Sequence, residues 1–119
     1  LLGLVRHMAE VERGWFRRGA GFQDAPPRYC SEDNWDGDFD DVDTADVIEA
    51  FDAWRDERQR AREIVAAAPS LDMETRGKRD SSTGPFTLRW IMVHIIEEYA
   101  RHNGHADLLR ERIDGSAGA

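Results

Sequence analysis

The sequence predicts an all-α fold of up-and-down helices, built as a bundle. Three stretches carry apolar residues at the steps of three and four that are typical of amphipathic helices. Residues that commonly start or stop helices bound these stretches, and the segments between them are polar. With 119 residues, the chain fits a single domain with a modest core, spanning residues 1–119.

The first helix is expected at about residues 1–18, and Gly19 and Gly21 end it. The chain opens inside this pattern without Met and without a capping residue, so we expect further residues upstream of Leu1 in the full protein. The apolar positions that recur at helical spacing are Leu1, Leu4, Val5, Met8, Val11, Trp15 and Phe16.

The second helix is expected at about residues 44–68, with Thr44 as its N-cap and Pro69 as its stop. Arg58 falls on the apolar stripe of this helix. Its charge either reaches solvent past the edge of the core or binds an anionic cofactor in a central cavity. The stripe itself comprises Val47, Phe51, Trp54, Ala61, Val65 and Ala68.

The third helix is expected at about residues 86–113, with Pro85 before it and Asp114 and Gly115 after it. The loop that precedes it ends in the flexible "SSTG" of residues 81–84, and could instead hold a short hairpin. The loop after the first helix is long, acidic and broken by prolines.

Composition limits the function classes. A net charge of −8 argues against general binding to nucleic acid, and no apolar run approaches the roughly 20 residues of a membrane span. Cys30 is the single cysteine and no export signal is visible, which together favour a reducing, cytoplasmic location. The sequence also lacks a phosphate-binding glycine loop and a serine-nucleophile motif.

The third helix places Glu98 and His102 at the centre of its core seam, four residues apart and therefore about 6 Å from each other on one face. An unpaired buried carboxylate is costly, so it must find a partner or a metal. Zn²⁺ accepts both groups and commonly takes three protein ligands at catalytic sites; Ni²⁺ also suits the set. His7, at the edge of the first helix's stripe, is the expected third ligand. The seam comprises Leu88, Ile91, Ile95, Glu98, His102, Ala106, Leu109 and Ile113.

Other polar residues are given supporting or structural roles. His94 and His105 flank the seam. Either could be a ligand by spacing alone, and we expect them instead to contact the ligands or to lie at the boundary of the core. Glu10, Glu97 and Arg101 are expected in solvent. The aspartates at 36, 38, 40, 41 and 43 fit a calcium loop poorly, and we expect a solvated acidic loop. Cys30 lacks the surroundings of a catalytic thiol.

The end helices carry a family resemblance. "GLVRHMAEVERGWF" followed by "LRWIMVHIIEEYARHNGHADLLRERIDG" resembles the DinB-like superfamily, and more closely the actinobacterial branch related to the metal-binding domain of mycothiol-dependent maleylpyruvate isomerase. This resemblance implies a four-helix bundle whose first helix precedes Leu1, with a homodimer as another way to cover the open face. It also implies a divalent metal held by His7, Glu98 and His102, and places His105 where many members carry a glutamine.

The function implied by the resemblance is that of a metal-dependent, mycothiol-using transferase or isomerase. Its partners would be a small-molecule thiol and a small electrophile, because a metal lowers the pKa of a bound thiol as it does that of water. Two alternatives remain at this point. One is a hydrolase that uses activated water, and the other is a non-catalytic interaction or stress module in which the three residues only hydrogen-bond.

Overall fold

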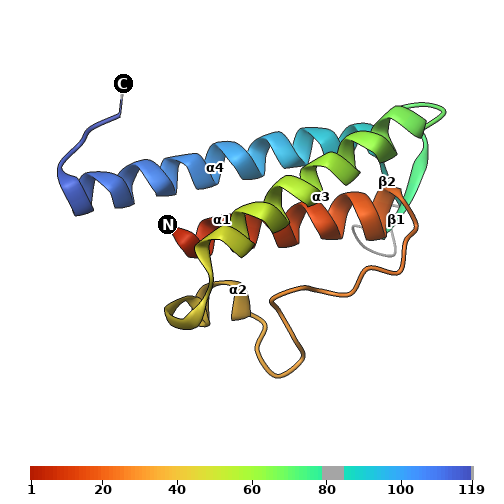
Figure 1. Cartoon of the computed structure of the whole chain (residues 1–119). Coiled ribbons are helices and arrows are strands. Elements are labelled where there is room, and N and C mark those ends of the chain that lie inside the picture. Colours follow the sequence, from red (N-terminus) through yellow and green to blue (C-terminus); the bar gives the residue numbers. More distant parts are fainter. Residues whose placement is uncertain (79–84, 119) are drawn as a thin grey trace.

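The computed structural model describes residues 1–78 and 85–118. It confirms the all-α bundle, and three long helices dominate the described part (Figure 1). Helix α1 (Leu2–Glu12) continues directly into a π-helix, η1 (Arg13–Ala20). Helices α3 (Val47–Ala67) and α4 (Leu88–Asp114) both pack against this first helix. A short helix α2 (Gly37–Asp40) and a 3-10 turn η2 (Val42–Thr44) lie in the loop before α3.

The helix ends differ from the sequence-based expectations where capping chemistry decides them. Asp46, not Thr44, is the N-cap of α3, since its carboxylate accepts the backbone N–H of Glu49 at 2.9 Å. Thr87 caps α4 in the same way, by accepting the N–H of Trp90. The predicted stop at Gly115 is confirmed, with this glycine in the left-handed conformation at φ 76°.

The loop before α4 forms the hairpin that the sequence left open as an alternative. Strands β1 (Glu74–Lys78) and β2 (Pro85–Thr87) pair antiparallel, with Glu74 opposite Thr87. The "SSTG" stretch lies outside the described residues. None of the helices in the described part is long and apolar enough to cross a membrane.

The packed face of α3 differs from the predicted stripe at its N-terminal end, where Val47 is 55% exposed. Toward the other end Ala61 is in the core, and Val65 and Ala68 of the stripe pack against it. Three of the four buried positions are alanines, so the α3 backbone can approach α1 where larger side chains would hold it away. The buried positions of α3 are Ala50, Ala53, Glu57 and Ala61.

Glu57 forms the ion pairs between α3 and the first helix. It is 1% exposed, and its Oε1 accepts Arg13 Nη1 at 2.7 Å and Arg17 Nη1 at 3.1 Å. Both arginines come from η1, so a single buried carboxylate fixes the π-helix to α3. The other oxygen, Oε2, has no hydrogen-bond partner among the described residues.

The seam of α4 is buried only in its first half. Leu88, Ile91 and Ile95 join the core cluster with Phe16, Ala20 and Ala61, whereas Ile113 is 70% exposed. Helix α4 extends beyond the N-terminal end of α1 (Figure 1), so its last turns have no helix to pack on. Glu98 and His102 lie between these two halves and are half-buried.

Candidate metal centre and adjoining cavity

His7, Glu98 and His102 converge where α1 crosses α4. Each offers one ligand atom, and the three atoms all lie within 4.8 Å of one another. Glu98 Oε2 is 3.3 Å from His102 Nε2, and the rings of His7 and His102 meet edge to face at 4.6 Å between centroids. The structure thus brings together the three residues that the sequence predicted as ligands. Two imidazole nitrogens and a carboxylate oxygen form a donor set that suits Zn²⁺.

Asp38 fixes the orientation of His7. Its Oδ2 lies 2.7 Å from His7 Nδ1, and the residue is only 4% exposed. A carboxylate can only accept, so His7 donates from Nδ1 and its Nε2 keeps a free lone pair. A carboxylate behind a ligating histidine in this way sets its tautomer and raises its basicity. The expectation that Asp38 is solvated with the rest of the acidic loop is therefore wrong.

Backbone contacts hold Asp38 in place. Arg6, itself buried, donates from Nε to the carbonyl oxygen of Asp38 and from Nη2 to that of Gly37. Its guanidinium also stacks 4.0 Å over the ring of Tyr29. Gly37 is required at its position, since a Cβ there would stand 2.2 Å from the carbonyl oxygen of Tyr29. The glycine adjoins both Asp36 and Asp38 in the sequence, so it gave no local sign of which aspartate is buried.

Glu10 is a second acidic residue for which the solvated prediction is wrong. Its Oε1 accepts the backbone N–H groups of Arg28, Tyr29 and Cys30. The carboxylate satisfies three amides that would otherwise be left without partners where the loop crosses α1. Glu10 therefore attaches the long loop to the helix that carries His7.

The flanking histidines contact the candidate ligands. His94 Nε2 lies 3.3 Å from Glu98 Oε1, and its ring stacks on Trp90 at 4.8 Å. His105 Nδ1 lies 3.2 Å from His102 Nδ1. These placements agree with the supporting positions expected for both residues, although their roles stay predictions.

The electrostatics of the site favour the neutral form of the His102 imidazole. Burial lowers its pKa, and the neighbouring His7 lowers it further, while Glu98 opposes the effect. The neutral imidazole, which is the form that coordinates a metal, is therefore favoured near neutral pH.

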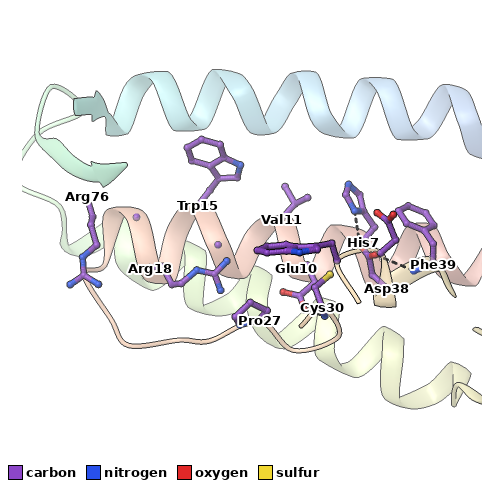
Figure 2. Close-up of a pocket in the computed structure, with 14 residues that line it drawn as sticks. His7, Glu10, Val11, Trp15, Arg18, Pro27, Cys30, Asp38, Phe39 and Arg76 are labelled. Atoms are coloured by element: carbon purple, nitrogen blue, oxygen red, sulfur yellow. Dashed lines mark hydrogen bonds and ion pairs between the residues drawn. The ribbon is translucent and has the colours of Figure 1, made fainter. Parts of the chain in front are cut away.

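A cavity of about 630 Å³ opens beside His7 (Figure 2). His7, Asp38 and Phe39 lie at one end, and Arg18 and Arg76 lie toward the other. The long loop supplies the remaining wall. The full lining comprises His7, Glu10, Val11, Gly14, Trp15, Arg18, Gly19, Pro27, Cys30, Trp35, Asp36, Asp38, Phe39 and Arg76.

The sequence matches one known protein family over almost its whole length. Residues 1–115 match the family described as mycothiol-S-transferase. The chain belongs to the mycothiol-S-transferase family. This is a DinB-like family, so the resemblance seen in the two end helices is confirmed. No curated protein and no solved structure matches the sequence significantly.

In this mycothiol-S-transferase family member, Arg58 lies apart from the three candidate ligands. Its guanidinium stands 4.6 Å over the ring of Trp54, and it lines a separate cavity of about 360 Å³ with Glu12 and Met92. There a hydrogen-bonded chain joins Trp54 Nε1 to Tyr99 Oη at 2.9 Å and Tyr99 Oη to Glu12 Oε1 at 2.8 Å. Anion binding by Arg58 stays a prediction, and its position separates it from the cavity beside His7.

Cys30 lines the cavity beside His7 without acquiring the features of a nucleophile. Burial raises the pKa of its thiol, so the reactive thiolate is scarce near neutral pH. The lining thus provides a free thiol that stays protonated.

Proposed function

We propose that this protein is a metal-dependent mycothiol S-transferase that conjugates the thiol to a small electrophile. The family match supports mycothiol-linked transfer. The observation that carries the metal dependence is the convergence of His7, Glu98 and His102 within 4.8 Å beside a cavity. The same geometry supports this reading over a purely structural cluster, because Asp38 prepares His7 with a free Nε2 lone pair.

The chemistry of the site follows from its residues. His7, Glu98 and His102 would hold a divalent ion, with Zn²⁺ as our first choice and Ni²⁺ as the second. Such an ion lowers the pKa of a thiol that it coordinates and so supplies a thiolate at neutral pH. Asp38 keeps the His7 tautomer, and His94 keeps the Glu98 carboxylate in place by contact at 3.3 Å.

The cavity accounts for the second substrate. In Figure 2 Trp15 stands level with the Arg18 guanidinium, and Trp35 and Phe39 also line the cavity. Aromatic walls bind the apolar body of an electrophile and exclude water from the attacking sulfur. The transfer forms a carbon–sulfur bond, while the electron pair of the broken bond departs with the leaving group and the thiol proton passes to solvent.

The first test is metal binding. Metal-free protein is titrated with Zn²⁺ and Ni²⁺ while its thermal midpoint is followed. A site filled at one hundred times its Kd stabilises the fold by about 2.7 kcal/mol, which raises the midpoint of a domain this size by roughly 10 °C. Glu98→Gln should lose this rise. Glu97→Gln is the matched control, because Glu97 precedes it on the same helix and its side chain is 70% exposed.

The second test is conjugation. Metal-loaded protein should consume an electrophile only when mycothiol is present, and a chelator should stop the reaction. Turnover without any thiol would point instead to a hydrolase. Protein that binds no divalent ion even in excess, with Glu98→Gln and Glu97→Gln behaving alike, would leave only a structural role for the three residues.

A further inference from the structure

One face of the first helix forms the floor of the cavity. Its lining residues follow steps of three and four along α1 and η1, which places them on a single side. His7 stands at one end and Arg18 stands eleven residues later, in the π-helical part. The residues of this face are His7, Glu10, Val11, Gly14, Trp15, Arg18 and Gly19.

The Arg18 guanidinium folds back along this face toward His7. A Cβ placed on Gly14 would stand 2.7 Å from Arg18 Nη2, so the glycine provides the space in which the guanidinium lies. Gly14 is seven residues from His7, so the charge sits about 10 Å along the axis from the candidate metal centre. This segment is π-helical, a conformation that often marks functional sites.

Arg18 has no carboxylate partner among the described residues. Its Nη1 donates to the carbonyl oxygen of Ala25 at 2.6 Å, and Arg76 Nη2 likewise donates to that of Phe22 at 3.1 Å. By contrast Arg13 and Arg17, from the same π-helix, share the Glu57 carboxylate. The cavity thus has two guanidinium groups that form no ion pair with a carboxylate of the described residues.

The carboxylates that line the cavity accept hydrogen bonds from other groups or lie toward the His7 end. Glu10 accepts three loop amides, and Asp38 accepts from His7. Asp36 comes two residues before Asp38 on the same loop segment. The Arg18 end of the cavity therefore presents two guanidinium groups that form no ion pair with the described carboxylates, in a protein whose net charge is −8.

We infer that the cavity selects electrophiles that carry an anionic group, a carboxylate or a sulfonate, on the side opposite the reacting carbon. Arg18 binds the anion by charge-assisted hydrogen bonds, and Arg76 adds its charge from β1. Trp15, which follows Gly14 on the same lining face, contacts the apolar body. The inference rests on the proposed transferase function for the identity of the ligand. The cysteine of mycothiol has both its amino and its carboxyl group in amide bonds, so the thiol brings no carboxylate for Arg18.

A pair of aryl chlorides tests this selection. In 4-chloro-3-nitrobenzoate the carboxylate lies opposite the reacting carbon across the ring, and 4-chloro-3-nitrobenzamide has the same shape without the charge. In either compound the thiolate sulfur bonds to the carbon that carries chlorine. The carbon–chlorine bond then breaks, chloride leaves with its electron pair, and the thiol proton goes to solvent.

Binding is measured first, by calorimetry without thiol, so that it does not depend on catalysis. The benzoate should bind about tenfold more tightly than the benzamide, as expected for one charge-assisted interaction. Arg18→Gln should abolish the preference. Arg55→Gln removes the same charge from an exposed position on α3 and should leave it intact.

Gly14→Ala tests whether the position of the Arg18 guanidinium matters as well as its charge. The added methyl must displace the guanidinium, while alanine favours helix more than glycine does, so the fold is not weakened. We expect this variant to lose the preference although it retains Arg18 and its thermal midpoint. Conjugation with mycothiol should follow the same order, with the difference in KM.

The outcomes distinguish the two proposals. Equal binding of benzoate and benzamide, or a preference that survives in Arg18→Gln, would overturn the anion site even if both compounds are conjugated. A charge preference in binding without any thiol-dependent turnover would instead support the anion site and refute the transferase.

Discussion

Replacement of Asp38 by asparagine tests whether the buried carboxylate prepares His7 for a metal. In the wild type both oxygens accept, Oδ2 from His7 Nδ1 at 2.7 Å and Oδ1 from the backbone N–H of Phe39 at 3.1 Å. Asparagine has the same shape but offers one oxygen and one NH₂ group. One of these two contacts must therefore fail.

Both arrangements of the amide weaken the metal site. If the oxygen stays on the Phe39 N–H, the NH₂ group faces His7 Nδ1 and requires the tautomer with its proton on Nε2. That proton occupies the lone pair needed for the metal. If the oxygen stays on His7, the NH₂ group faces another donor at Phe39, and a buried hydrogen bond is lost at a cost of about 1–3 kcal/mol.

The expected result is a divalent-metal affinity about 10 to 100 times weaker in Asp38→Asn. Competition with a chromophoric chelator measures it directly. Asp36→Asn is the control, since it removes the same charge from an exposed residue of the same cavity. Equal affinities for the two variants would refute the reasoning, because the loss would then reflect charge alone and not the tautomer of His7.

Three further perturbations address the fold around the site. Burial raises the pKa of Glu12 above its ordinary 4.5, against the opposing hydrogen bond from Tyr99, so the folded state holds this proton more tightly than the unfolded chain. Its contribution to the free energy of unfolding is complete below pH 4.5 and is lost as pH rises through the folded-state pKa. In Glu12→Gln, urea unfolding should no longer show this fall in the free energy of unfolding with pH. Glu57→Ala should cost about 3–5 kcal/mol because two partly buried guanidiniums lose their partner, whereas Asp52→Ala, in an exposed pair, should cost under about 1 kcal/mol by the same assay. Gly37→Ala should displace α2 through its clash at Tyr29 and lower metal affinity by at least as much as Asp38→Asn does; unchanged affinity would show that the backbone there does not position Asp38.

The helices of this protein, and the relative placement of residues on one helix, could be predicted from its sequence. Helical periodicity fixes the angle between side chains on one helix, so the placement of Glu98 beside His102 required no tertiary information. The hydrophobic pattern located the three long helices, with ends shifted by a few residues. The boundary at Thr44 failed because several neighbouring residues can cap a helix, and Asp46 is the one whose side chain meets a free N–H.

The loop residues of the site were not readable in this way. Five aspartates lie between residues 36 and 43, and only contacts from other elements select Asp38 as the buried one. Arg6 donates a hydrogen bond to the backbone carbonyl of Asp38, and His7 donates one to its side-chain carboxylate. The acidic composition predicted a solvated loop, which was wrong for Asp38. Glu10 on the first helix was also expected in solvent, and this was wrong because Glu10 binds the loop backbone.

Two arginines also differ in what the sequence predicts and where the tertiary structure places them. Arg58 and Arg18 both lie on helices near apolar positions, and the sequence singled out only Arg58, whose charge would either reach solvent or bind an anion. The structure places Arg58 over Trp54 in a separate cavity, and folds Arg18 over Gly14 toward His7. Sequence by itself determined the helices and the pairing of Glu98 with His102, because those depend on residues within one or two turns. Only the tertiary structure decided which loop carboxylate and which guanidinium share a cavity with them, because long side chains and irregular loops take their positions from distant contacts.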